Sequence, residues 1–452
     1  MSRTDEGTGE RWRRSPAVGA LLIAGYVACL VAPLLIAWLS HMGEDDELVS
    51  KLGRGFALAG AVLLAMQLVL AARLRGVFEH YGLDAVLRFH RRLAVAGVLL
   101  ILAHPILLAA GDDGWSLLTS LRWPWYILLG KAAMVVLLIQ VGTSLWRNRM
   151  RLRFEKWRMA HNLAPALLAL VFLHSWAAGT DLQSRPLRSF WVVAFAAAVT
   201  AYLSHRLRMW QAARRRAYRV TDVTRETPNV WTLGLAPIAG VTPPRYLPGQ
   251  FHFLRLYRGD RYDGEEHPFT IVSSPTESGR LRSTIKESGD FTATIGGTKP
   301  GARVGVQGPF GRFSYLLHPQ QTDLVFIAGG IGITPLMSML RHMKDTAADA
   351  DVLLLYGNRT EEDIAFRDEL ERISGQARPR LRVVHILSQA GEGWQGEAGY
   401  VDRSALLRHC GADLQSKRFY ACGPPLMMRL VTQALRELGV SPRRIHSERF
   451  VL

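Results

Sequence analysis

The chain has 452 residues, of which 49% are hydrophobic and 21% are charged, and its formal net charge is +17 at pH 7. This length predicts two or three domains. The three cysteines are far apart and show neither a CxxC nor a metal-binding spacing, which excludes iron–sulfur clusters and predicts no disulfide. Because the basic residues gather beside long apolar runs, we expect membrane topology, and not nucleic-acid binding, to explain the charge.

Apolar runs dominate the first half of the chain. Six of them are long enough to cross the hydrocarbon core of a bilayer, and each is bounded by charged or turn residues. The first is too long for the apolar core of a cleavable signal peptide. The predicted spans are approximately Ala17–Ser40, Gly55–Arg73, His90–Ala110, Tyr126–Trp146, Met159–Ala178 and Phe190–His205.

The loops between these runs differ in charge. The N-terminal tail and the segments after the second, fourth and sixth runs are rich in arginine, whereas the other loops carry mainly acidic residues. The positive-inside rule then places both termini in the cytoplasm. We therefore assign residues 1–16 to a cytoplasmic tail and residues 17–206 to an all-α, six-helix membrane domain.

Four histidines lie in the third and fifth runs. His90 and His104 are 14 residues apart, and His161 and His174 are 13 apart. Each pair is separated by roughly 20 Å along a helix. Both runs cross the membrane in the same direction, so His90 matches His161 in depth near the cytoplasm, and His104 matches His174 near the exterior. Ionisable residues inside spans are usually functional, and we interpret the four as ligands of two b-type haems. No CxxCH occurs, which excludes covalent haem attachment.

The helical repeat places His90 and His104 on one face of a helix more readily than His161 and His174. A separation of 14 residues falls about 40° short of four helical turns, whereas 13 residues fall about 140° short. Pro165 lies between His161 and His174, and a proline kink can change that phase. For any single histidine the alternative is a packing or hydrogen-bonding role.

Two arginines are candidate partners of haem propionates. Arg54 stands at the outer end of the second run, near the depth of His104. Arg73 stands at the inner end of that run, near the depth of His90. The alternative for Arg54 is a solvated charge in a loop.

After about Tyr218 the pattern changes to short strands separated by Gly and Pro turns. A small antiparallel β-barrel is predicted up to about Ser314. From Asp323 the order becomes strand, glycine turn, helix, strand, which is the βαβ rhythm of a parallel nucleotide-binding sheet. We assign residues 215–316 to an FAD-binding barrel and residues 320–452 to an α/β NAD(P)-binding domain.

Two segments of the barrel suit a flavin. In the sequence His-Pro-Phe-Thr, the ring can lie on the isoalloxazine and the hydroxyl can bond its polar edge. The second segment, Lys286–Thr292, is predicted to open a short helix whose free amides and Thr hydroxyl bind the pyrophosphate. The predicted flavin residues are His267, Pro268, Phe269, Thr270, Ser274, Lys286, Gly289 and Thr292.

Three segments of the last domain suit a nicotinamide dinucleotide. A glycine-rich turn after an apolar strand departs from the strict GxGxxG spacing but lets the backbone approach a pyrophosphate at a helix start. Cys422, at another strand end, can sit beside the nicotinamide, although a buried structural cysteine is the alternative. Arg359 can pair with a 2′-phosphate and favours NADPH, with NADH left open. The predicted residues are Gly329, Gly330, Gly332, Thr334, Pro335, Arg359, Cys422, Gly423 and Pro424.

The chain resembles the NADPH oxidase and ferric reductase superfamily. The resemblance rests on the histidine spacings of 14 and 13, the His-Pro-Phe-Thr segment, the glycine turn that begins at Gly329 and the Cys-Gly-Pro-Pro segment that begins at Cys422, in this order. The resemblance extends from Ala17 to Leu452 and is greatest to bacterial members, which lack regulatory EF-hands. It implies a ferric-reductase-like membrane domain and a ferredoxin-reductase-like module, in the inner membrane of a bacterium. Family members end in an aromatic residue that covers the flavin, and Phe450 is the candidate here.

The resemblance implies that electrons pass from NAD(P)H through FAD and two b-type haems to an extracytoplasmic acceptor, with no side chain acting as general acid or base. Animal superoxide-producing members carry a second histidine where this chain has Leu108, and an aromatic residue is missing at Leu167. We expect O₂ as acceptor, with a ferric chelate or a separate extracytoplasmic redox protein as alternatives. The short outer loops favour a small diffusible acceptor. Membrane lipid is an expected partner, and no obligate protein partner is expected.

Overall fold

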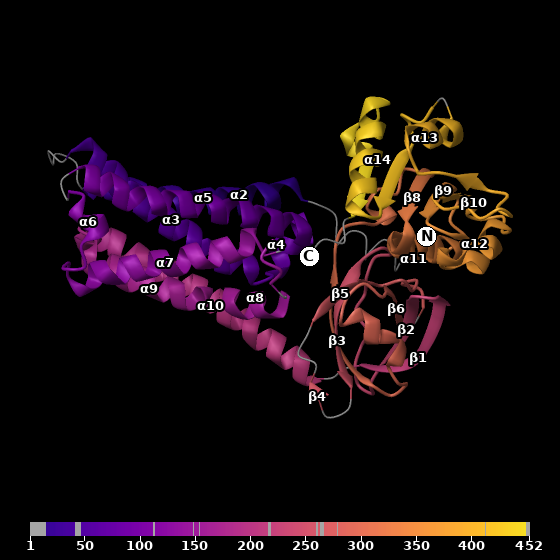
Figure 1. Ribbon diagram of the computed structural model, residues 1–452, viewed down its shortest axis with the longest axis horizontal. Helices are drawn as coiled ribbons and strands as arrows, with labels where there is room; N and C mark the ends of the chain where they lie inside the picture. Colours follow the sequence, from indigo (N-terminus) through magenta and orange to yellow (C-terminus); the bar gives the residue numbers. More distant parts are fainter. Residues whose placement is uncertain are drawn as a thin grey trace. The chain divides into compact units, whose positions relative to one another are not determined.

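The computed structural model describes residues 15–40, 47–111, 114–147, 149–152, 154–215, 218–258, 261–262, 266–277, 279–411 and 413–448. The chain folds as two compact units, Arg14–Trp210 and Gln211–Leu452 (Figure 1). The first unit is a helical bundle, and the second contains two β-sheets.

The first unit confirms the six predicted membrane crossings. Among the described residues, six helical segments are long and apolar enough to span a bilayer. They are α2 (Pro16–Ser40), α3 (Leu48–Ala71), α5 (Leu83–Ala110), α7 (Trp125–Leu145), α8 (Phe154–His161) with α9 (Ala164–Ala178), and α10 (Arg185–Arg215). The shorter segments are α4 (Arg75–Tyr81), α6 (Ser116–Thr119) and η1 (Asp181–Gln183). In Figure 1, α6 lies at one end of the bundle and α4 and α8 lie at the other.

The fifth crossing is interrupted between its two histidines. Helix α8 ends at His161, and α9 begins at Ala164 with Pro165 in its first turn. A proline lacks the backbone N–H and is tolerated in the first turn of a helix but not in its interior. The prediction that Pro165 disturbs this helix is therefore confirmed, although the helix is broken and not only kinked. The break frees His161 and His174 from the phase of one continuous helix.

The second unit begins with an antiparallel barrel. Its seven strands have the order β4-β3-β7-β1-β2-β6, with β5 beside β3. The amide of Val272, after β5, donates to the carbonyl of Arg282 in β6 at 2.8 Å and links the two ends of the sheet. The strands are β1 (Tyr218–Thr227), β2 (Val230–Pro237), β3 (Phe251–Arg258), β4 (Arg261–Tyr262), β5 (His267–Thr270), β6 (Leu281–Lys286) and β7 (Arg303–Phe310). Short 3₁₀ helices occur at η2 (Thr292–Gly297) and η3 (Tyr315–Leu317).

The second sheet of this unit is parallel, as predicted. Its order is β11-β10-β9-β8-β12-β13. The strands are β8 (Asp323–Gly329), β9 (Asp351–Asn358), β10 (Arg380–Leu387), β11 (Glu397–Ala398), β12 (Arg418–Cys422) and β13 (Ile445–Glu448). The 3₁₀ turns are η4 (Gly330–Gly332), η5 (Glu361–Asp363) and η6 (Pro442–Arg444).

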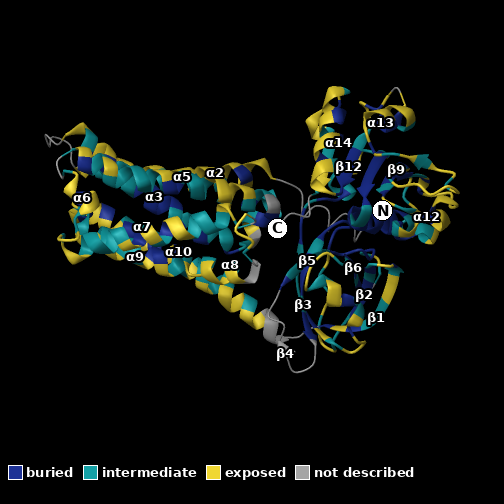
Figure 2. Ribbon diagram, in the orientation of Figure 1, coloured by how far each residue is buried: buried dark blue, intermediate teal, exposed yellow. Residues whose placement is uncertain are grey.

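Helices cover both faces of the parallel sheet. Side chains of α11 (Ile333–Asp345) and α12 (Arg367–Ser374) form one apolar core with the strands, and those of α13 (Arg403–Cys410) and α14 (Pro425–Glu437) form another on the opposite face. Figure 2 shows buried residues along the central strands. From β8 the chain adds β9 on one side and later β12 on the other. A nucleotide is expected at the carboxyl ends of the strands at such a switch point.

Candidate functional site

The first candidate metal site lies between helices α5 and α8. The imidazole rings of His90 and His161 have centroids 6.4 Å apart and planes at 80° to each other. Two imidazoles bound to opposite sides of one metal ion, with metal–nitrogen bonds of about 2 Å, have centroids about 6 Å apart. The observed spacing therefore fits one metal ion between the two rings. The Nδ1 atoms of both rings are buried without a hydrogen-bond partner among the described residues.

Trp157 supports one side of this pair. Its ring stacks on His161, one helical turn away in α8, with centroids 5.2 Å apart and an angle of 20°. Its indole Nε1–H donates to the Ser144 hydroxyl at 3.0 Å, and the guanidinium of Arg147 lies over the ring. Trp157 therefore restrains the orientation of the His161 ring. Sequence reasoning did not identify this residue.

The second candidate site consists of His104 in α5 and His174 in α9. Nδ1 of His104 is 3.0 Å from the Gly53 carbonyl oxygen, and Nδ1 of His174 is 2.7 Å from the Tyr126 carbonyl oxygen. A carbonyl only accepts hydrogen bonds, so each Nδ1 carries a proton and donates it. In a neutral ring the lone pair is then on Nε2, which is how metal-bound histidines are commonly held.

The packing of α3 against α5 explains why both histidines of α5 face inward. The helices approach closely at Gly60, where a Cβ would lie 3.2 Å from the carbonyl oxygen of Gly97. Two turns away in either direction, the backbone of α3 faces a histidine. Gly53 contacts His104 at one end, and the backbone of Gln67 faces His90 at the other, without full hydrogen-bond geometry.

A glycine of α7 makes room for His174. A Cβ on Gly130 would lie 2.6 Å from Cε1 and 2.7 Å from Nδ1 of the His174 ring. Gly130 is four residues after Tyr126, whose carbonyl therefore also accepts the helical hydrogen bond of the Gly130 amide. The absence of a side chain at Gly130 lets the imidazole reach that carbonyl. Gly53, Tyr126 and Gly130 were all missed by sequence reasoning, because their roles depend on a neighbouring helix.

The two predicted arginines lie at opposite ends of α3. Arg54 follows Gly53 and is thus at the depth of His104, as expected. Its Nε is 3.6 Å from Oδ1 of Asp181, and the two side chains are 24% and 11% exposed. Asp181, in η1 after α9, was not predicted. Arg73 follows the other end of α3 in a turn with a φ of 46°, and it is half-buried.

The predicted flavin residues of β5 converge with the segment before η2. The rings of His267 and Phe291 stack with centroids 3.9 Å apart, and Phe269 lies parallel to Phe291 at 6.3 Å. Thr270 is 3% exposed, and its hydroxyl is buried with no hydrogen-bond partner among the described residues. A buried unpaired hydroxyl is costly. A polar ligand edge reaching Thr270 would remove that cost, and this fits a flavin. Pro268 pairs with Phe253 of β3 in the strand register.

The predicted pyrophosphate segment differs from the expectation in one respect. The short helix is the six-residue 3₁₀ helix η2, and the amides before it are not free. The Thr292 hydroxyl accepts the amide N–H groups of Ser288 at 2.8 Å and Gly289 at 2.9 Å. An anion at this turn would have to replace the hydroxyl. Lys286 ends β6 beside the turn and is half-buried.

Ser274, predicted beside the flavin, lies in a buried turn. Its hydroxyl is 2.6 Å from the Thr276 hydroxyl, and its side chain has no exposed surface. The structure thus gives Ser274 a role in closing the turn after β5. Phe450, the predicted aromatic cover, lies outside the described residues.

The two predicted nicotinamide loops meet at the carboxyl ends of β8 and β12. A Cβ on Gly332 would lie 2.2 Å from the Cys422 carbonyl oxygen, and a Cβ on Gly329 would lie 2.7 Å from Cδ of Pro424. Gly330 has a φ of +51°, which favours glycine. Close packing of the two loops at Gly329 and Gly332, and the positive φ of Gly330, therefore restrict these positions to glycine. A backbone concavity at this switch point fits a dinucleotide pyrophosphate.

The remaining residues of these loops are mostly buried around the glycines. The Thr334 hydroxyl donates to the Ile331 carbonyl at 3.0 Å and closes the turn, and Pro335 is buried in the first turn of α11. Gly423 is buried beside Gly329. Burial, and secondly the charge of Glu448, raise the pKa of the Cys422 thiol well above its ordinary value. Cys422 is therefore a neutral thiol that can offer a soft surface but not a thiolate.

The carboxyl end of β9 offers two further groups. Arg359 is 62% exposed, and its Nε is 3.3 Å from Oδ2 of Asp363. Asn358, just before it, is buried beside the Tyr356 hydroxyl, and neither of its side-chain amide atoms has a hydrogen bond of full geometry among the described residues. Such buried amide atoms beside a nucleotide site fit hydrogen bonding to a ribose or base. Asn358 was not among the predicted site residues.

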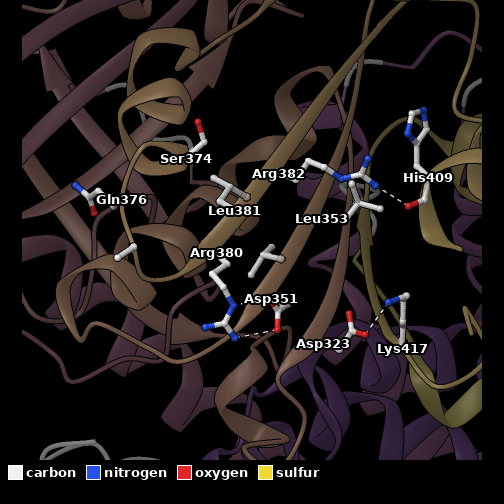
Figure 3. A pocket seen from close by; sticks show the side chains of 12 residues that line it. Asp323, Asp351, Leu353, Ser374, Gln376, Arg380, Leu381, Arg382, His409 and Lys417 are labelled. Atoms are coloured by element: carbon white, nitrogen blue, oxygen red, sulfur yellow. Dashed lines mark hydrogen bonds and ion pairs between the residues drawn. The ribbon is translucent and has the colours of Figure 1, made fainter.

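A cavity of about 500 Å³ lies at the opposite, amino-terminal edge of the parallel sheet (Figure 3). Its charges are paired with each other. Arg380 contacts Asp351 at 2.6 Å, and Lys417 contacts Asp323 at 2.6 Å. Because sheets of this kind bind nucleotides at the carboxyl ends of their strands, we do not assign this cavity to the cofactor.

Comparison with known protein families gives three matches. Residues 56–173 match the ferric reductase like transmembrane component, residues 238–315 the oxidoreductase FAD-binding domain, and residues 326–433 the oxidoreductase NAD-binding domain. The order of the matches is the order of domains predicted from the motifs.

Two curated relatives each match less than half of the chain. The chain is 28% identical over 195 residues to NADH-cytochrome b5 reductase 2 of Scheffersomyces stipitis, covering 39% of this chain and 65% of the relative. It is 34% identical over 214 residues to the glycine betaine monooxygenase reductase subunit of Chromohalobacter salexigens, covering 45% and 56%. The chain thus spans less than two thirds of either relative. The solved structure of flavohemoglobin from Malassezia yamatoensis, with bound FAD and heme, is 17% identical to this chain with a TM-score of 0.50. The match covers 90% of this chain and 100% of the flavohemoglobin, and it shows a likeness of fold alone.

Proposed function

We propose that this membrane oxidoreductase transfers electrons from NAD(P)H to an acceptor across the membrane. The chain has the domain architecture of the NADPH oxidase and ferric reductase superfamily. The proposed path runs through FAD and two b-type haems. The proposed acceptor is O₂, reduced by one electron to superoxide. The observation that carries this proposal is the pairing of His90 with His161 at a spacing that fits one metal ion.

Each cofactor has a candidate set of residues. FAD converts a two-electron hydride into single electrons, and haem iron passes them one at a time. His90 and His161 would hold the inner haem, and His104 and His174 the outer one. Thr270 and Phe269 would orient the flavin, while the glycine turn at Gly330 would bind the dinucleotide pyrophosphate. The described residues hold no cluster of three His, Cys, Asp or Glu side chains that could bind a further metal ion.

The surroundings of the outer pair favour a neutral acceptor. Arg54 is ion-paired with Asp181, so its charge is largely compensated. Leu108 contributes an apolar side chain, which would lie 3.1 Å from a Cβ on Gly53. A small apolar molecule such as O₂ suits this environment better than an anionic iron chelate. One-electron reduction of O₂ to superoxide also needs no proton, and the scheme requires no general acid.

Leu108 also supports a second candidate function. It replaces the histidine that animal superoxide-producing members carry at this position, so ferric-chelate reduction is the alternative to oxygen reduction. A third possibility is electron donation to a separate extracytoplasmic redox protein. We also propose that both termini lie in the cytoplasm, because arginine clusters flank the same ends of the spans. The proposed membrane is the inner membrane of a bacterium, on the resemblance to bacterial members of the superfamily.

One set of assays separates the acceptors. Purified protein is given NADPH or NADH, and superoxide is scored under air with a dismutase-sensitive reporter. Reduction of a ferric chelate is scored without oxygen. Rapid chelate turnover with negligible superoxide would refute the oxidase proposal and favour the reductase. Failure of both assays while the haems become reduced would favour a protein acceptor.

The haem assignment has a separate test. His104→Ala should remove the absorbance of one haem and leave flavin reduction intact, and His161→Ala should remove the other haem. Retention of two haems in either variant would refute the pairing. The dinucleotide preference is tested by Arg359→Ala, which should raise the KM for NADPH and leave that for NADH unchanged.

A further inference from the structure

Helix α11 connects the nucleotide domain to the flavin barrel along one of its faces. Its N-terminus follows the glycine turn Gly330–Gly332, and its later residues contact the segment that follows Thr270. The Ser338 hydroxyl donates to the Ser273 carbonyl at 2.9 Å, and Asp345 accepts from the Thr276 hydroxyl at 2.5 Å. Residues three and seven positions apart lie on one face of a helix.

Arg341, between these two contacts, joins the domains through a buried charge. Its Nη1 donates to the carbonyl of Val272 in the barrel at 2.8 Å. Its Nε and Nη2 donate to the two carboxylate oxygens of Glu369 in α12, at 2.8 and 2.7 Å. The side chain is 8% exposed and lies over the ring of Phe366. All three nitrogens of the guanidinium are thereby fixed in direction.

Breaking the Arg341–Glu369 ion pair would cost free energy. Burial raises the pKa of the Glu369 carboxyl, but the hydrogen bonds and charge of Arg341 lower it below its ordinary value, so the pair stays ionised. A buried charged group that loses its partner is strongly unfavourable. Apolar packing adds to the contact, because Val272 belongs to the same buried core as Leu336 and Met337 of α11.

These hydrogen bonds connect the two cofactor sites over a short stretch of the chain. Val272 lies two residues after Thr270, the predicted flavin contact. Arg341 lies on the helix that begins directly after Gly332, the predicted pyrophosphate contact. A movement of α11 relative to the barrel would therefore change the distance between nicotinamide and flavin. Hydride transfer requires the reacting atoms to approach to about 3–3.5 Å, and small misplacements are costly in rate.

We propose that Arg341 is a positioning residue for hydride transfer, holding the nucleotide domain in register with the flavin barrel through Val272 and Glu369. This inference rests on the proposed function. Arg341 touches neither cofactor in this scheme. Its effect is on the geometry of the reacting pair and not on the affinity for either molecule.

The test compares Arg341→Lys with a matched control. Lysine keeps the charge beside Glu369 but lacks the planar fork, so it cannot bond the carboxylate twice and also reach Val272. The control is Arg380→Lys, because Arg380 also bonds both oxygens of a carboxylate but lies at the amino-terminal edge of the sheet (Figure 3). Ser338→Ala is a milder second variant, which removes one parallel contact without disturbing a charge.

Two readouts are needed on the full-length protein. The first is single-turnover oxidation of NAD(P)H, with the deuterium isotope effect at the nicotinamide and the dissociation constant for NADP⁺. For Arg341→Lys we expect the hydride-transfer rate at saturating dinucleotide to fall about 10- to 100-fold, with a larger isotope effect and an NADP⁺ affinity changed less than about threefold. Ser338→Ala should show a smaller fall, and Arg380→Lys none.

The second readout is amide hydrogen exchange of the cofactor-free protein. Exchange in residues 271–276 should accelerate in Arg341→Lys and stay unchanged in Arg380→Lys. The proposal is overturned if Arg341→Lys only weakens NADP⁺ binding, or if its rate and exchange match the wild type. If Arg341→Lys does not fold, the same criteria apply to Ser338→Ala. A wild-type protein that fails to oxidise NAD(P)H would refute the proposed function itself.

Discussion

Replacing Gly130 by alanine tests the outer histidine pair without altering a histidine. The new methyl group would lie 2.6 Å from Cε1 of His174, whereas ordinary contacts begin at 3.4 Å. The imidazole would have to retreat by about 0.8 Å, and metal–ligand distances tolerate only about 0.2 Å. The retreat would also strain the hydrogen bond from Nδ1 to the Tyr126 carbonyl, now 2.7 Å long.

Opposing effects accompany this change. Alanine in a helix interior is more favourable than glycine by about 0.5–1 kcal/mol, which stabilises α7. Overpacking costs about 1–3 kcal/mol, and loss of the hydrogen bond costs about 1 kcal/mol more. The steric cost therefore dominates at the site. We expect the outer haem to bind more weakly by about 1–3 kcal/mol, or about 5- to 150-fold.

The assay is haem content per protein, with reduced-minus-oxidised spectra and electron paramagnetic resonance to distinguish the two haems. Gly142→Ala is the matched control on the same helix, because its methyl group would meet only Trp146, at an ordinary 3.6 Å. The inner haem should be unaffected in both variants. Two haems with unchanged spectra in Gly130→Ala would refute the reasoning, as would equal haem loss in Gly142→Ala.

Three further predictions concern single side chains. Thr270→Val should raise the stability of the cofactor-free protein by about 1 kcal/mol, because it removes a buried unpaired hydroxyl, and weaken FAD binding roughly tenfold; thermal unfolding and FAD titration measure both, and unchanged affinity would contradict the assignment. Trp157→Leu should weaken the inner haem about 2- to 10-fold by removing the stack on His161, whereas Trp157→Phe should not, as judged by haem content. Burial lowers the pKa of His252 to about 3. Between that pH and an ordinary pKa of about 6.5, this histidine is protonated only in the unfolded chain. The free energy of unfolding therefore falls with decreasing pH, by up to about 1.4 kcal/mol per pH unit. His252→Asn should flatten this dependence, and identical pH profiles of unfolding would show that the histidine does not contribute.

The sequence alone determined the features that depend on composition and local order. Six spans follow from the length of apolar runs, because a bilayer imposes a fixed thickness on any crossing helix. The two sheet types follow from the change in hydrophobic pattern after Tyr218. The glycine turn at 329, 330 and 332 could be located because it follows an apolar strand, whereas its contact with a pyrophosphate stays a prediction.

Only the tertiary structure decided the features that depend on a second helix or domain. Helical phase opposed the pairing across the fifth span, and the break before Ala164 removed that objection. The carbonyls of Gly53 and Tyr126 orient the outer histidines, but a carbonyl is present in every residue and leaves no mark in a sequence. In the sequence, nothing distinguishes Arg341 from the other arginines of the chain. Its partners Val272 and Glu369 are 69 and 28 residues away, and no local pattern encodes their meeting.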